Sequence, residues 1–211
     1  QDQPVAPELL KKLITTAAHS PSAGNTQPWE VVVAQGTVLD TIKAESEKLF
    51  LAGVPANADL PNIFNAGKVT EAWPELLAKR YQDCGRLILN TLGIERGDKK
   101  GRMKFYLDMH RYFEAPAVVF VGFDRKLPEG YAMYDLGLFS QSLCLAAQAE
   151  GLGTCIMAVG GFYPDMLRAK LPAPAHLKIG VGIALGYPDM NAPINNFERQ
   201  YAPLNEWVHG L

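Results

Sequence analysis

The stretch that most constrains this chain is residues 21–29, PSAGNTQPW, which lie between an apolar helical pattern and an apolar strand pattern. Its two prolines exclude helix, and Gly24 permits a left-handed turn. Ser22, Asn25 and Gln27 then offer hydroxyl and amide groups, together with backbone N–H groups, to a flat polar ligand. An ordinary helix-to-strand turn explains the same residues, so the local chemistry leaves both interpretations open.

The composition favours a globular protein that binds small molecules or other proteins. The 211 residues are 48% hydrophobic and 20% charged, which suits one domain with a substantial core. A formal net charge of −2 provides no basic surface for nucleic acid or membranes, and no apolar run reaches transmembrane length. The odd count of three cysteines, without metal-binding spacing, favours a reducing cytoplasm over a disulfide framework.

Hydrophobic periodicity predicts helices interspersed with short strands. Helices are expected at 7–19, 38–51, 73–92, 98–113 and 133–150, and strands at 30–34, 117–121, 154–159 and 178–186. The prolines, asparagines and glycines of residues 52–67 predict a long irregular loop that lines or covers a site. No linker or repeat is visible, so we expect a single domain, 1–211, with an excursion of loop and helices around 52–113.

Two segments carry more apolar surface than a small domain needs. The helix expected at 133–150 is apolar on almost every side, so it must be buried centrally or against a second copy of the chain. The apolar tail, 194–211, is expected to pack on another subunit or along the edge of the sheet.

Two features beside the expected strands are candidates for ligand binding. Gly160 and Gly161 follow a strand and precede a helix, where exposed N–H groups suit a ligand, but a tight turn has the same sequence. Arg111 precedes the strand at 117–121 and is either a site residue or a surface arginine. No nucleophile with an acid–base partner accompanies them, since the four histidines are scattered.

Several motifs in register along nearly the whole chain resemble the nitroreductase family of FMN flavoproteins. They are the loop at 21–29, the entry to a strand from Arg111 to Pro116, the helix from Asp135 that runs into Gly-Leu-Gly-Thr-Cys, and Leu-Gly-Tyr-Pro-Asp at 185–189. The two Tyr-Pro-Asp segments and the residues around Pro193 are most similar to the branch associated with reduction of nitrobenzoate and other nitroarenes.

The resemblance implies an α+β fold, with a small mixed β-sheet sandwiched by helices, and an intertwined homodimer with two FMN sites at its interface. Pro21, Ser22 and Asn25 of one subunit then face an FMN held mainly by the other, and Gln27 belongs to the same cofactor-binding loop. The other implied cofactor contacts are Arg111 at flavin N1 and the C2 carbonyl, the backbone of Val159, Gly160 and Gly161 at the N5/O4 edge, and Arg199 at the phosphate.

The activity implied is FMN-dependent reduction of nitroaromatic or quinone-like acceptors with NADH or NADPH, by ping-pong transfer. The flavin carries the chemistry, so no side chain is assigned as catalytic and no metal is expected. The family usually opens with an Arg-Ser-x-Arg segment that binds the phosphate, and this sequence begins just after the place where that segment would stand; whether residues before Gln1 supply it stays open. The alternatives are ene reduction, dehalogenation or flavin breakdown within the same family, and a flavin-binding or sensing protein without turnover.

Overall fold

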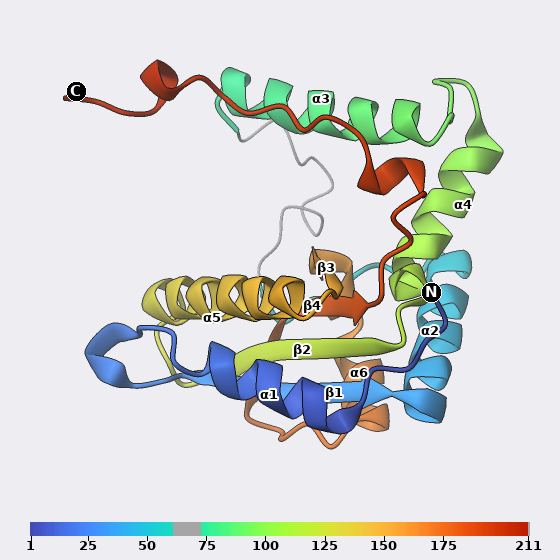
Figure 1. Ribbon diagram of the computed structural model, residues 1–211. Helices are drawn as coiled ribbons and strands as arrows, with labels where there is room; N and C mark the ends of the chain where they lie inside the picture. The colour runs from blue at the N-terminus through green and yellow to red at the C-terminus, as the bar shows by residue number, and fades with distance from the viewer. Residues whose placement is uncertain (61–72, 211) are drawn as a thin grey trace.

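The computed structural model describes residues 1–60 and 73–210, and a four-stranded sheet lies at its centre (Figure 1). The strands are β1 (Trp29–Gln35), β2 (Ala117–Asp124), β3 (Gly153–Met157) and β4 (Leu177–Gly186), in the order β1-β2-β4-β3. All three neighbouring pairs are antiparallel. The expected mixed sheet is therefore wrong for the described strands: β2 and β3 run in the same direction, but β4 lies between them, so no two neighbouring strands are parallel.

The five helices expected from periodicity are all present, and a sixth follows η3. The helices are α1 (Pro7–Ala17), α2 (Gly36–Leu51), α3 (Glu75–Thr91), α4 (Lys99–His110), α5 (Glu129–Ala149) and α6 (Pro164–Lys170). A short 3₁₀ helix, η3 (Ala158–Gly161), replaces the expected end of β3. Residues 52–60 form no helix or strand, as expected, whereas 61–67 lie outside the described residues.

α4 ends at His110, before the expected residue 113, because the backbone turns left-handed immediately afterwards. Tyr112, Phe113 and Glu114 have φ angles of 53°, 52° and 57°. Non-glycine residues rarely adopt this conformation, and it is incompatible with a right-handed helix. The turn brings Tyr112 into the core beneath the sheet.

Helices cover both faces of the sheet, which confirms the expected sandwich (Figure 1). On one face α1 and α5 pack against alternate residues of β2, including Val119, Val121 and Phe123. On the other face α2, α6 and η3 cover Val118 and Phe120 of the same strand. β2 is thus buried on both sides, which explains why its sequence is a continuous apolar run.

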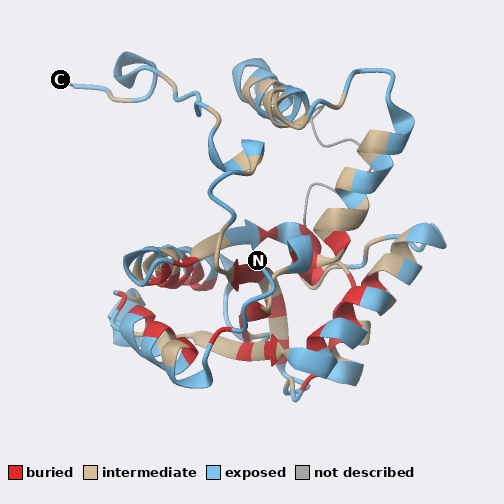
Figure 2. Cartoon of the chain, turned by 45° about the vertical axis from the view of Figure 1, so that its right-hand side comes forward, coloured by how far each residue is buried: buried red, intermediate tan, exposed pale blue. Residues whose placement is uncertain are grey.

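α3 and the C-terminal tail stand apart from this core and run beside each other (Figure 1). Figure 2 shows no buried residue on α3, and none of its residues is classed as buried. An ion pair between Arg80 and Glu206 joins α3 to the tail. Tyr201 of the tail is 84% exposed, and α5 leaves Tyr131, Tyr134 and Leu145 exposed on its outer side. Much apolar surface therefore has no cover within one copy of the chain.

His110 lies where α4 joins the core, and it is buried. Its Nδ1 lies 3.0 Å from the Ser46 hydroxyl, and its ring stacks on Phe50 with centroids 4.4 Å apart. The ring of Tyr163 stacks at 5.9 Å. Burial among these groups lowers the pKa of His110 from its usual 6.5 to about 4, because the charged imidazolium is poorly solvated there.

This pKa predicts a loss of stability in acid. Between pH 6.5 and pH 4 the unfolded chain takes up a proton at His110 that the folded chain does not, so the free energy of unfolding falls as pH falls. The contribution is about 3 kcal/mol and is fully present above pH 6.5. Urea denaturation at pH 7 and pH 4 should show this extra loss in the wild type relative to His110→Asn. Equal losses in both proteins would contradict the prediction.

Candidate functional site

The loop that follows α1 contains several residues in the left-handed backbone conformation, which an ordinary turn does not require. Gly24, Asn25 and Gln27 have φ angles of 57°, 55° and 49°. The Ser22 hydroxyl accepts a hydrogen bond from the Gln27 backbone N–H at 2.9 Å, and the Gln27 side chain donates to the Asn25 carbonyl at 3.1 Å. Left-handed non-glycine residues cost about 1–2 kcal/mol each, and such strain is concentrated at functional sites.

Asp135 holds this loop to α5, and the sequence analysis did not assign it that role. Its two carboxylate oxygens share one hydrogen bond from the Ala23 backbone N–H, at 3.1 and 3.2 Å. Asp135 is only 3% exposed. One turn further along α5, Phe139 stacks on Trp29 with centroids 5.3 Å apart. The available signal was an acidic residue in the interior of a largely apolar helix, because a buried carboxylate needs hydrogen-bond donors.

Gly160 and Gly161 form a second group, which the structure places against β4. A Cβ on Gly160 would lie 2.7 Å from Gly182 Cα, so only glycine permits this approach of η3 to the strand. A Cβ on Gly161 would lie 3.2 Å from the Gly180 carbonyl oxygen. The Tyr112 hydroxyl lies 3.5 Å from the Gly160 carbonyl, and burial raises the pKa of this tyrosine.

A small apolar hollow of about 150 Å³ lies between α5 and the β3–β4 edge. It is lined by Met133, Leu136, Gly137, Ser140, Gln141, Ile156, Gly180 and Val181. The Gly180 carbonyl also lies close to Gly161 of η3. The hollow therefore adjoins the turn at Gly160 and Gly161, which we call the glycine turn. A flat apolar ring with a polar edge suits such a surface, because Gly137 and Gly180 bring no side chain into the hollow. Val159, Gly160 and Gly161 are themselves buried within one copy of the chain.

Arg111 is engaged by two carboxylates. Its guanidinium contacts Glu47 at 2.7 Å and also pairs with Glu114, and these hydrogen bonds, first to Glu114 and then to Glu47, raise its pKa. The ammonium of Lys43, which is buried, lies 3.2 Å from Glu114. The four charges alternate and compensate one another, so the positive charge that Arg111 offers to a ligand is reduced.

Arg199 lies in the tail, where its guanidinium stacks over the Phe197 ring at 5.1 Å. Within residues 1–60 and 73–210, no recorded hydrogen bond or ion pair joins Arg199, the loop at 21–27 and η3 to one another. Val159, Gly160 and Gly161 lie together in η3. Tyr112, which follows Arg111 in sequence, contacts Gly160 through its hydroxyl. One copy of the chain therefore presents the expected cofactor-binding residues as separate groups.

Within residues 1–60 and 73–210, no three His, Cys, Asp or Glu side chains are arranged to hold a metal ion. None of the helices described has the length and apolar character needed to cross a membrane.

Comparison with known proteins identifies the family. The nitroreductase family model matches residues 1–187, so the chain belongs to the nitroreductase family. A nitrobenzene nitroreductase of Ectopseudomonas oleovorans is 29% identical over 207 residues, covering 98% of this chain and 88% of that protein. A 4-nitrobenzoate reductase of Pseudomonas putida is 28% identical over 210 residues, covering 98% and 87% respectively.

The fold agrees with a solved member of the family. The crystal structure of the FMN-dependent nitroreductase NfnB from Mycobacterium smegmatis, in complex with NADPH, matches with a TM-score of 0.90. The sequences are 27% identical, and the match covers 100% of this chain and 91% of that one. The chain therefore has the nitroreductase fold, as the sequence motifs indicated.

Removal of the Asp135 carboxylate should release the loop at 21–27. A hydrogen bond to a charged acceptor contributes about 1.5–3 kcal/mol, so the Ala23 amide should exchange with solvent roughly ten- to a hundredfold faster in Asp135→Ala. Asp135→Asn keeps an acceptor oxygen and is the matched control, with a smaller increase. Hydrogen–deuterium exchange measures the amide. Unchanged exchange at Ala23 in Asp135→Ala would show that this contact does not hold the loop.

Proposed function

We propose that the protein is an FMN-dependent oxidoreductase that uses NADH or NADPH to reduce nitroaromatic or quinone-like acceptors by a ping-pong mechanism. The observation that carries this proposal is membership of the nitroreductase family, with the fold of an FMN-dependent member matched over the whole chain. FMN, when bound, accepts a hydride from the nicotinamide and transfers electrons to the acceptor. The protein itself has to bind, orient and shield the reactants.

The described residues fit FMN in two respects. The hollow between α5 and β4 is apolar, with Ser140 and Gln141 as polar members, which suits a flavin ring system. The contact of Gly160 with Gly182 excludes any larger residue and holds the η3 backbone in a fixed position. In our proposal, backbone N–H groups of Val159, Gly160 and Gly161 orient the N5/O4 edge of the flavin, and Arg111 orients N1 and the C2 carbonyl.

The active form in this proposal is an intertwined homodimer. Support comes from α3, which is Glu75–Thr91 and has no buried residue although its sequence is amphipathic. In proteins, packing of the apolar face of an amphipathic helix supplies most of the stability of that helix, so α3 is expected to be covered. A second copy of the chain covers α3, the tail and the outer side of α5, where Tyr131 and Tyr134 are exposed.

Dimerisation also explains why the cofactor-binding residues are in separate groups. Pro21, Ser22, Asn25 and Gln27 of one subunit reach an FMN held mainly by the hollow and η3 of the other, with Arg199 at the phosphate. In the same arrangement, the excursion of residues 52–113 covers the flavin and excludes water. We place the protein in the cytoplasm, because Cys84, Cys144 and Cys155 are all unpaired.

A spectral titration tests the proposed function. The purified protein, reconstituted with FMN, is titrated with NADPH and then NADH without oxygen, and 4-nitrobenzoate or a quinone is added afterwards. Bleaching of the flavin bands by a nicotinamide and their return with the acceptor are expected. Bound FMN that neither nicotinamide bleaches would contradict the proposal and favour a flavin-binding protein without turnover. Failure to bind FMN would remove the cofactor assignment.

Arg111→Gln tests the proposed role of that guanidinium. A donor that stabilises the reduced flavin contributes about 1.5–3 kcal/mol, so its loss should make the two-electron potential of bound FMN about 30–60 mV more negative. Arg96→Gln, at an exposed arginine between α3 and α4, is the control and should leave the potential unchanged. Potentials are measured by dye equilibration. An unchanged potential in Arg111→Gln would mean that Arg111 only neutralises Glu47 and Glu114.

A further inference from the structure

The edge of β4 beside the glycine turn is completed by a side chain instead of a strand. β3 pairs with β4 from Gly186 only as far as Gly182, so the first part of β4 extends beyond β3. There the backbone N–H of Ile179 donates to the Asp59 carboxylate at 2.9 Å. Asp59 lies in the first part of the excursion, in the irregular segment that follows α2. Its carboxylate supplies the acceptor that a neighbouring strand would otherwise provide.

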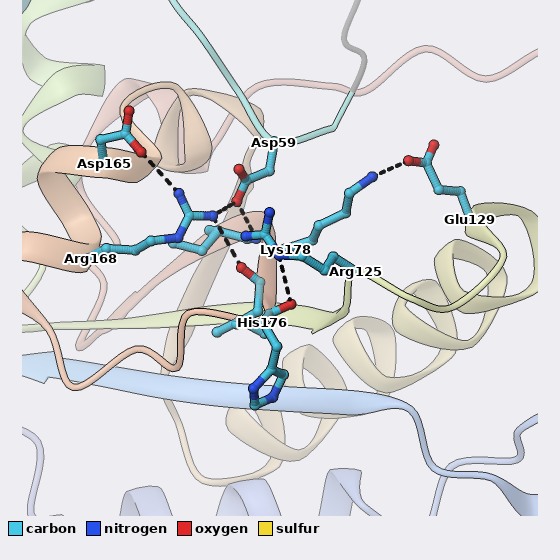
Figure 3. Close-up of polar contacts among 9 residues, drawn as sticks. Asp59, Arg125, Glu129, Asp165, Arg168, His176 and Lys178 are labelled. Carbon is cyan, nitrogen blue, oxygen red and sulfur yellow. Dashed lines mark hydrogen bonds and ion pairs between the residues drawn. The ribbon is translucent and has the colours of Figure 1, made fainter.

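Arg168 of α6 binds the same carboxylate and the same strand (Figure 3). Its guanidinium pairs with the Asp59 oxygen that accepts from Ile179, and it also donates to the Leu177 carbonyl at 3.1 Å. The side chains of Asp59 and Arg168 are only 14% and 20% exposed. Because this pair is largely shielded from water, loss of one partner leaves the other charge poorly compensated.

Two more hydrogen bonds hold the same segment to the residues that follow the glycine turn. The Asn57 backbone N–H donates to the Phe162 carbonyl at 2.9 Å. The Tyr163 hydroxyl donates to the Val54 carbonyl at 3.2 Å. Residues 54–60 are thus joined to the chain on both sides of the site, at β4 and directly after Gly161. We call this set of contacts, made by Val54, Asn57 and Asp59, the loop anchor.

The loop anchor is continuous with the surface that lines the proposed flavin site. Leu60, next to Asp59, belongs to the core, and a Cβ on Gly180 would lie 3.4 Å from its Cδ1. Gly180 lines the hollow beside α5 and also lies against Gly161. A shift of residues 54–60 therefore moves the strand edge and the turn that lie on either side of the hollow.

We propose that Asp59 is a positioning residue for the flavin site, which fastens residues 54–60 to β4 and thereby fixes the Gly160–Gly161 backbone. This inference rests on the proposed function, because it assigns the N5/O4 edge of FMN to that backbone. Asp59 acts through Ile179 and Arg168 and contacts no reactant. Its loss loosens the turn before the cofactor binds, so the bound flavin loses orientation as well as affinity.

The chain offers a matched control for this inference. Asp165 also pairs with Arg168, at 3.2 Å, but its side chain is 87% exposed and has no recorded contact with β4 among the described residues (Figure 3). Asp59→Ala and Asp165→Ala each remove one carboxylate from the same arginine. If Arg168 needs only a counter-charge, the two variants should weaken FMN binding to a similar extent. If the loop anchor positions the flavin site, only Asp59→Ala should weaken it.

The test measures FMN affinity by quenching of flavin fluorescence, well below the unfolding temperature of each variant, and the visible circular dichroism of the bound flavin. Asp59→Ala should raise the Kd for FMN about tenfold or more and change the dichroism, while Asp165→Ala stays within about twofold of wild type. Equal Kd values and spectra in Asp59→Ala and wild type would overturn the inference, even if Asp59→Ala lowers the melting temperature.

Two additions keep the result decisive. Asp59→Asn retains an acceptor for Ile179 and replaces Asp59→Ala if that variant does not fold; a Kd raised about threefold is then expected, and an unchanged Kd overturns the inference. Amide exchange in the FMN-free protein separates this inference from the proposed function. If wild type binds no FMN, the proposed function fails, and exchange at Gly160 and Gly161 that is unchanged by Asp59→Ala overturns the loop anchor as well.

Discussion

Burial of apolar surface is the dominant favourable term in folding, and one copy of this chain completes it only around the sheet. There α1 and α5 on one face, and α2 and α6 on the other, bury β2 from Ala117 to Phe123. α3 and the tail are held to each other by the pair of Arg80 with Glu206 and contribute no buried residue of α3. A second copy of the chain is the simplest source of the missing cover.

The same constraint shapes the proposed flavin site. Gly160 and Gly161 pack against β4, and the loop anchor joins the chain at Phe162, directly after them. We propose that these contacts make a rigid floor for a flat cofactor. The loop at 21–27 is held in a strained conformation by Asp135 of α5, whose neighbours Met133 and Leu136 line the hollow. Strain maintained by a buried carboxylate indicates that this conformation of the loop has a function. Among the described residues of one copy, no hydrogen bond joins the loop to η3.

Hydrophobic periodicity was sufficient to predict the helices and the strands, because these depend on the local spacing of apolar residues. The sandwich was instead implied by the resemblance to the nitroreductase family. Strand direction could not be predicted from periodicity, because pairing joins residues far apart, such as Val121 with Val181. The left-handed turn at Tyr112 to Glu114 contains no glycine, so the sequence carried no signal for the early end of α4. Asp59 and Arg168 are more than a hundred residues apart, and nothing local in either segment indicated their contact. For the same reason the pairing of Arg111 with Glu47 was not foreseen.

We propose that two copies of the chain build each flavin site. Sedimentation equilibrium of the FMN-reconstituted protein, detected both at the flavin band and in the ultraviolet, measures the mass of the species that carries the cofactor. A flavin-bearing species of two chains with two FMN, and weak FMN binding under conditions that separate the chains, is the predicted result. A single chain that binds one FMN with undiminished affinity would contradict the claim.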